Sequence, residues 1–224
     1  MKRQVSLEEI SDGKLYGAQD MVRADCQGCQ GCSACCHGMG NSIILDPLDC
    51  FRLSEGLGRS LEALLQDKIE LNVVDGIILP NLRMTGEEER CAFLNEEGRC
   101  SIHPYRPGVC RLFPLGRYYD GTGFWYFLQT RECRMENRSK VKVKKWIDTP
   151  DLKQYEKFVS DWHYYLMDLE EEAGRSGEAA KQISMYILQQ FYLKPYAYGE
   201  DFYPQFEQRM EDGRRFLEQL KRDR

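Results

Sequence analysis

The 224-residue chain has ordinary contents of hydrophobic (42%) and charged (30%) residues, which predicts a globular protein able to bury a core without disulfide staples. Its formal net charge of −5 argues against a general nucleic-acid binder, which normally has a basic surface. The start, MKRQVSLEEISDGKLYGAQD, lacks the apolar core of a signal peptide, and no run approaches the roughly 20 apolar residues that span a bilayer. We therefore expect a cytoplasmic protein with neither a nucleic-acid nor a membrane partner.

The first part of the chain predicts short elements separated by turns. Residues 26–42 are a loop rich in glycine and cysteine. Asp46 and Pro47 are typical of a helix start, and Gly56 is the expected stop. Further elements are expected at four places: a short helix over 60–70, a β-like segment over 72–79 that turns at Asp75-Gly76, two short strands within 91–102, and a hairpin of 115–119 with 124–130.

The tail of the chain reads as helices. The first starts at Thr149-Pro150-Asp151 and repeats apolar residues at helical spacing through Leu169; others are expected over 177–193 and around Phe206–Leu220. Their aromatic stripes predict core packing. The predicted fold class is α+β, with a small cysteine-rich, turn-rich metal-binding region of short helices and hairpins followed by a C-terminal helical segment. The expected domains are a cysteine-cluster domain over 1–148 and a helical segment over 149–224 that packs on it.

Cysteine is the unusual residue of this composition. All ten cysteines lie between Cys26 and Cys133. In a chain without an export signal, this usage indicates metal or redox chemistry more often than disulfides.

The densest cysteine motif is CQGCQGCSACC, over residues 26–36. A two-residue gap lets both thiolates of a CxxC reach one metal, and small residues in the gaps permit the tight turns that this needs. Three cysteines in CxxCxxC spacing suit three corners of a [4Fe–4S] cluster, whereas zinc more often takes two separate CxxC pairs. Neighbouring side chains of an extended backbone point to opposite faces, so Cys35 and Cys36 are expected to face different ways.

A second block places cysteines among arginines. Cys91, Cys100 and Cys110 could meet at one locus through the turns between them, and Cys133 follows the expected hairpin. Guanidinium groups can neutralise a thiolate-rich centre. For Arg106 and Arg111 this role is weighed equally with plain surface exposure, and for Arg99 surface exposure is favoured.

Three blocks, CxxCxxCC at Cys29–Cys36, CxFLxxxGxC at Cys91–Cys100 and RPxxCRxFP at Arg106–Pro114, resemble the YkgJ-like cysteine-cluster family. That family is described as a "putative zinc- or iron-chelating domain". The resemblance covers roughly residues 26–135 and implies a set of metal or cofactor ligands: Cys29, Cys32, Cys35, Cys36, Cys91, Cys100, Cys110 and, with a looser match, Cys133.

The chain departs from the family pattern in two places. Cys26 adds one more CxxC step and is a ninth candidate ligand, and His103 stands where the family often has Tyr. Flagellin lysine methylases carry a related cluster, but this chain looks too short to be one, so methyl transfer is not carried over.

The remaining candidates are weaker. Cys50 has no metal-type spacing and is expected to be structural. His37 and His103 are minority candidates for a ligand or a proton donor, and His163 is expected to be structural. A basic stretch over 131–146 could bind an acidic partner or an anionic substrate, although a solvated connector is the favoured interpretation.

Three functional hypotheses remain. The leading one is an iron–sulfur protein with one or two [4Fe–4S] clusters, used for electron transfer or redox-linked chemistry with a redox partner protein. The second is a structural zinc-binding interaction module, and the third is a metalloenzyme with an open coordination site. No catalytic triad, P-loop or dinucleotide fingerprint is present, so the sequence leaves open whether the protein is an enzyme.

Overall fold

The computed structural model describes residues 6–28, 32–135 and 137–222, and these form an α+β fold, as expected. Contacts group the chain into two compact units, each made of two chain segments: Met1–Ile43 with Met84–Tyr155 (unit 1), and Ile44–Arg83 with Glu156–Arg224 (unit 2). Whether residues 1–148 fold independently, with 149–224 packing on them, stays a prediction. Within the described ranges, no helix combines the length and apolarity that crossing a bilayer requires.

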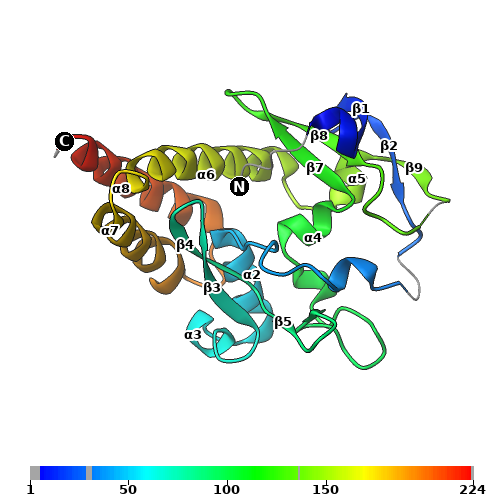
Figure 1. Ribbon diagram of the computed structural model, residues 1–224, viewed down its shortest axis with the longest axis horizontal. Helices are drawn as coiled ribbons and strands as arrows, with labels where there is room; N and C mark the ends of the chain where they lie inside the picture. Colours follow the sequence, from blue (N-terminus) through cyan, green and yellow to red (C-terminus); the bar gives the residue numbers. More distant parts are fainter. Residues whose placement is uncertain (1–5, 29–31, 136, 223–224) are drawn as a thin grey trace. The chain divides into compact units, whose positions relative to one another are not determined.

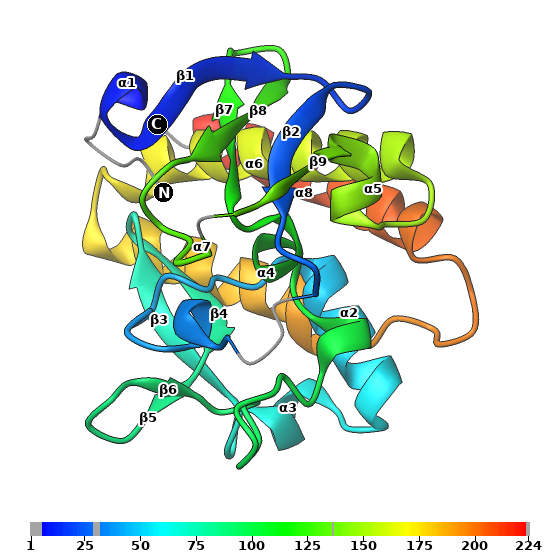
Figure 2. The same ribbon diagram turned by 90° about the vertical axis from the view of Figure 1, so that its right-hand side faces the viewer.

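The main sheet of unit 1 has three antiparallel strands in the order β1-β8-β7 (Figure 2). Its strands and the helical turn before them are α1 (Leu7–Ile10), β1 (Ser11–Tyr16), β7 (Leu115–Tyr119) and β8 (Phe124–Gln129). The hairpin expected at 115–130 is thereby confirmed. Its turn is fixed by the Asp120 carboxylate, which accepts the backbone N–H groups of Thr122 and Gly123 at 3.0 and 2.9 Å.

A second pair of strands in unit 1 joins segments far apart in sequence. β2 (Met21–Asp25), which leads into the cysteine-rich loop, pairs antiparallel with β9 (Ser139–Lys142), as Figure 2 shows. β9 continues into the short helix α5 (Val143–Ile147). The strand pairing therefore attaches the basic stretch to the start of the cysteine motif.

The cysteine-rich part of unit 1 contains little regular structure. Its elements are the 3-10 turns η1 (Ala34–Cys36) and η2 (His103–Tyr105), the helix α4 (Gly108–Leu112), and a small hairpin. The two strands of this hairpin, β5 (Met84–Thr85) and β6 (Arg90–Cys91), are two residues long each. The two strands expected within 91–102 reduce to β6 and one isolated bridge between Leu94 and Cys100. The turn over 95–98 leaves too few residues on each side for a ladder.

Unit 2 combines a hairpin with the helices of the tail (Figure 1). Its elements are α2 (Pro47–Leu57), α3 (Leu61–Leu64), β3 (Ile69–Val74), β4 (Ile77–Leu82), α7 (Gly177–Ile187), the π-helix η3 (Leu188–Leu193), α8 (Phe202–Arg222), and residues 156–173 of α6 (Leu152–Ala173). The helices expected in the tail and the turn at Asp75-Gly76 are confirmed.

Two boundary predictions in unit 2 were wrong. α2 starts as expected, with a reciprocal capping box between Asp46 and Asp49, but it runs through Gly56 to Leu57 and is capped by Gly58, whose φ of 61° is left-handed. The helix expected over 60–70 is a single turn, because Ile69 onward pairs with β4.

Aromatic rings fill the core of unit 2, as their helical spacing predicted. Phe158 of α6 packs edge-on against Phe206 of α8, with ring centroids 4.6 Å apart, and Trp162 lies 4.9 Å from Phe191 of η3. All four side chains are buried. His163, expected to be structural, contacts the ring of Tyr164.

Candidate metal centre

The first cysteine segment is attached to the β5–β6 hairpin through the backbone. His37 forms an antiparallel bridge with Arg90, and the Gly38 N–H donates to the Glu89 carbonyl at 3.1 Å. Because His37 follows Cys36 and Arg90 precedes Cys91, these two bonds bring the CC pair beside the second cysteine block.

The second cysteine segment folds back on itself. The Leu94 N–H donates to the Cys91 carbonyl at 2.9 Å, and the Ser101 N–H donates to the Phe93 carbonyl at 2.9 Å. Together with the bridge between Leu94 and Cys100, these bonds return Cys100 to the vicinity of Cys91. This ten-residue block therefore forms one local loop with a cysteine at each end.

These two segments bring together four thiols that influence one another's pKa values. We call this group the four-thiol cluster; it consists of Cys35, Cys36, Cys91 and Cys100. The Cys36 thiol donates a hydrogen bond to Cys35, and this bond is the main reason that the pKa of Cys35 falls to about 7. The pKa of Cys36 rises, first because of this bond, then because of burial and the nearby Cys35, Cys91 and Cys100. Burial also raises the pKa of Cys100.

The expectation that Cys35 and Cys36 face different ways was wrong. It assumed extended backbone, whereas residues 34–36 form the 3-10 turn η1, which the Cys36 N–H closes on the Ser33 carbonyl at 2.8 Å. The turn places the two thiols side by side.

Arg106 supplies positive charge to the cluster. Its guanidinium lowers the pKa of Cys35 and opposes the rise at Cys100, where Arg99 acts in the same direction. Arg106 Nη1 donates to His103 Nε2 at 3.1 Å, so that nitrogen must carry the lone pair. Burial first, and then the nearby arginines, lower the pKa of His103. A histidine whose Nε2 accepts from Arg106 orients the arginine rather than offering that nitrogen to a metal.

Thiolates are suitable ligands for both zinc and iron, and the donor chemistry of the cluster fits such a group. Within residues 6–28, 32–135 and 137–222, however, no three Cys, His, Asp or Glu side chains already stand in a coordinating arrangement. Binding would require the thiols to approach one another, and Cys29 lies outside the described residues.

The other candidate cysteines differ in burial and in the elements that carry them. Cys32 lines a pocket, and Cys110 is half-buried in α4. Cys133 is half-buried between β8 and β9, and Cys26 is buried just after β2. Cys50 is buried in α2 of unit 2, where burial raises its pKa.

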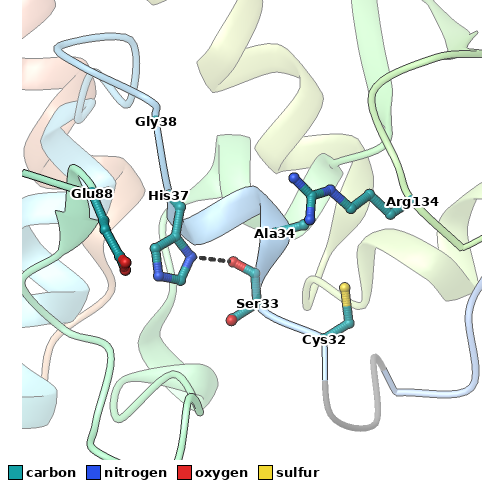
Figure 3. Close-up of a pocket in the computed structure, with 7 residues that line it drawn as sticks. All are labelled: Cys32, Ser33, Ala34, His37, Gly38, Glu88 and Arg134. Carbon is teal, nitrogen blue, oxygen red and sulfur yellow. Dashed lines mark hydrogen bonds between the residues drawn. The ribbon is translucent and has the colours of Figure 1, made fainter.

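The pocket at Cys32 has a volume of about 540 Å³ and is shown in Figure 3. His37 Nδ1 lies 3.0 Å from the Ser33 carbonyl, which can only accept, so Nδ1 donates and Nε2 of the neutral ring keeps its lone pair. Metal-binding histidines commonly make this contact with their second nitrogen. His37 can therefore act as a ligand or a proton acceptor, unlike His103.

Two residues complete this pocket. Glu88 lies on the side of the His37 ring away from Ser33, and Arg134 extends along the side of the pocket toward which the Cys32 sulfur points (Figure 3). Glu88 was not anticipated from sequence. The only signal was the acidic run Glu87-Glu88-Glu89 shortly before Cys91, which resembles an ordinary solvated turn.

Comparison with protein families gives one match. The model of the CxxCxxCC family, described as "Putative zinc- or iron-chelating domain", matches residues 28–150. No curated protein and no solved structure matches the chain. The matched range contains every candidate ligand except Cys26.

Proposed function

The chain belongs to the CxxCxxCC family, and we propose that it holds an iron–sulfur centre through its cysteines and serves electron transfer or redox-linked chemistry. The observation that carries the proposal is the pairing of two distant segments, in which the His37–Arg90 and Leu94–Cys100 bridges bring together the thiols of the four-thiol cluster. A thiolate-ligated [4Fe–4S] cluster, when bound, supplies one-electron chemistry.

The cysteine spacing favours iron–sulfur over zinc. The run Cys29, Cys32 and Cys35 offers three ligands from one short loop, and a fourth from a distant segment is the usual complement. The eight family-matched cysteines would suffice for two four-thiolate centres. We propose that the four-thiol cluster supplies the fourth ligand, Cys91 or Cys100, to the centre of Cys29, Cys32 and Cys35, and that Cys36 with the remaining distant cysteines forms a second centre.

The surrounding charges support a thiolate centre. Thiols must lose their protons to bind a metal, and Arg106 favours this at both Cys35 and Cys100. Cys36 keeps its proton most strongly while it donates to Cys35, so ligation of this pair would release that shared proton. We propose a cytoplasmic setting, where thiols stay reduced, and a redox partner protein.

Structural zinc is the alternative, and the same cluster favours it in one respect. Four thiols equal the tetrahedral complement that structural zinc takes. Under this alternative the centre would stabilise the cysteine-rich part of unit 1 and carry no electrons.

The deciding experiment is anaerobic purification followed by visible spectroscopy and assays of iron, acid-labile sulfide and zinc. We expect a coloured protein that contains iron and sulfide in stoichiometric amounts and whose visible absorption decreases on reduction with dithionite. A colourless protein that is replete in zinc and free of sulfide would refute the iron–sulfur proposal and support the zinc alternative.

A further inference from the structure

A second pocket in unit 1 has four cationic side chains among its lining residues and a volume of about 750 Å³. Three stretches of the chain form it: the segment from η2 to α4, the end of α5 with the residues that follow, and the first residue of α6. The pocket is of the size that holds a small molecule.

The charge in this pocket is strongly positive. Arg106, Arg111, Lys144 and Lys145 line it, and Asp148 is the single carboxylate among its lining residues. Neither lysine forms an ion pair within the described part of the chain, and both are exposed. This excess stands out in a protein whose net charge is −5.

Backbone contacts hold one of the arginines in place. Arg111 Nη1 donates to the Asp148 carbonyl at 3.1 Å, and its Nη2 donates to the Pro104 carbonyl at 2.8 Å. These bonds join the two chain segments that carry the arginines and the lysines. The positive charges are therefore brought together by the fold itself.

Buried polar atoms in the pocket lack protein partners. Arg106 Nε and Thr149 Oγ1 are both buried and accept or donate no hydrogen bond within the described residues. Leaving such groups unsatisfied is costly, which favours a site completed by a bound oxyanion.

The pocket also has an apolar side, made by Pro104, Pro150 and Leu152. Leu152 is the first residue of the 22-residue helix α6, whose amino-terminal end carries positive partial charge. The pocket thus combines an anion-binding side with a surface for an organic group.

We propose that this pocket, which shares Arg106 with the four-thiol cluster, binds a small molecule carrying a phosphoryl group. Two arginines and two lysines match a dianionic oxyanion better than a single carboxylate, since guanidinium groups bind phosphate oxygens in pairs. The four cations come from separate stretches of the chain and line one pocket, which favours a phosphomonoester over a nucleic-acid backbone.

The test is isothermal titration calorimetry of the full-length protein, as purified, with phenyl phosphate and with inorganic phosphate. The variant K144E/K145E reverses two pocket charges. Its matched control is K140E/K142E, which makes the same charge change on exposed lysines of the same basic stretch outside the pocket lining. A second pocket variant, K144Q/K145Q, removes the two charges without reversing them. Circular dichroism and metal analysis check that the fold and the metal content of each variant are unchanged.

We expect saturable phenyl phosphate binding to the wild type, weakened at least about tenfold in both pocket variants and less than about twofold in the control. If phenyl phosphate binds more tightly than phosphate, the apolar side of the pocket contacts the organic group of a phosphate ester. If the two probes bind equally well, the ligand of the pocket is free phosphate. No saturable binding of either probe, or equal weakening in pocket and control variants, would overturn the proposal.

Discussion

The thiol of Cys36 donates a hydrogen bond to the sulfur of its neighbour Cys35. This bond separates the two thiols chemically, because the acceptor is stabilised as thiolate and the donor as thiol. Cys35 is also the most exposed of the four clustered cysteines. The pair therefore combines a reactive, accessible sulfur with a protonated neighbour.

In metal-free, reduced protein, Cys35 is expected to react with iodoacetamide with a midpoint near pH 7, the value to which its pKa is lowered. Because the thiolate is the nucleophile, the rate should rise as the pH increases through the pKa and level off above it. Fragment mass spectrometry after timed alkylation at a series of pH values measures this for Cys35 alone.

Two variants of the donor separate the hydrogen bond from general electrostatics. Cys36→Ala removes the donor, so the Cys35 midpoint should move to higher pH, whereas Cys36→Ser keeps a donor and should hold the midpoint lower than in the alanine variant. Identical midpoints in the two variants would show that the bond has no influence on Cys35.

Gly116 in β7 lies opposite Phe127 of β8 and is required there by space. A Cβ at this position would lie 2.3 Å from the Phe127 ring. Gly116→Ala should therefore lower the free energy of unfolding by about 1–3 kcal/mol, the cost typical of overpacking. Urea denaturation measures it. Gly123→Ala in the same hairpin meets no atom within 4 Å and should change stability by no more than about 1 kcal/mol.

Arg209 of α8 is a buried cation that satisfies backbone carbonyls at the end of η3. It donates to the carbonyls of Gln190 and Lys194 at 2.9 and 2.8 Å and to that of Pro195 at 2.8 Å, while its guanidinium stacks 3.4 Å above the centre of the Tyr196 ring. The single ammonium group of lysine cannot reproduce these guanidinium hydrogen bonds to three carbonyls. Arg209→Lys should therefore lower the free energy of unfolding by about 3 kcal/mol.

The control for Arg209 is Arg214→Lys, an exposed position on the same helix. It should leave the thermal unfolding midpoint nearly unchanged. A similar small effect at both positions would mean that the buried arginine contributes nothing beyond its helix propensity.

Local patterns predicted many of the elements because their causes are local. Asp46-Pro47 encodes a cap and a helix start, and Asp75-Gly76 encodes a turn, whatever the rest of the chain does. The end of α2 was missed because Gly56 and Gly58 are equally plausible stops, and only the folded backbone decides which one becomes left-handed. The single turn of α3 has another cause, since pairing of Ile69 with Leu82 overrides the local helical pattern.

In the candidate site, too, the locally encoded features were predicted and those that depend on distant contacts were not. Cysteine spacing nominated the residues of the cluster, but the partnership of Cys36 with Cys91 depends on the bridge between His37 and Arg90, which spans more than fifty residues of sequence. The two histidines inside the family-matched range could not be ranked from sequence. Their different hydrogen-bond partners, a carbonyl for His37 and a guanidinium for His103, distinguish them.

The most direct test of the central claim is the metal content of two cysteine variants that differ only in which unit carries the change. Cys91 and Cys50 are similarly buried, at 8% and 5% exposure, and Cys91 belongs to the four-thiol cluster while Cys50 lies in α2 of unit 2. Mass spectrometry of bound iron and zinc per folded chain should show a clear loss in Cys91→Ala and the wild-type amount in Cys50→Ala. Full metal content in a folded Cys91→Ala protein would contradict the assignment of the four-thiol cluster as a metal centre.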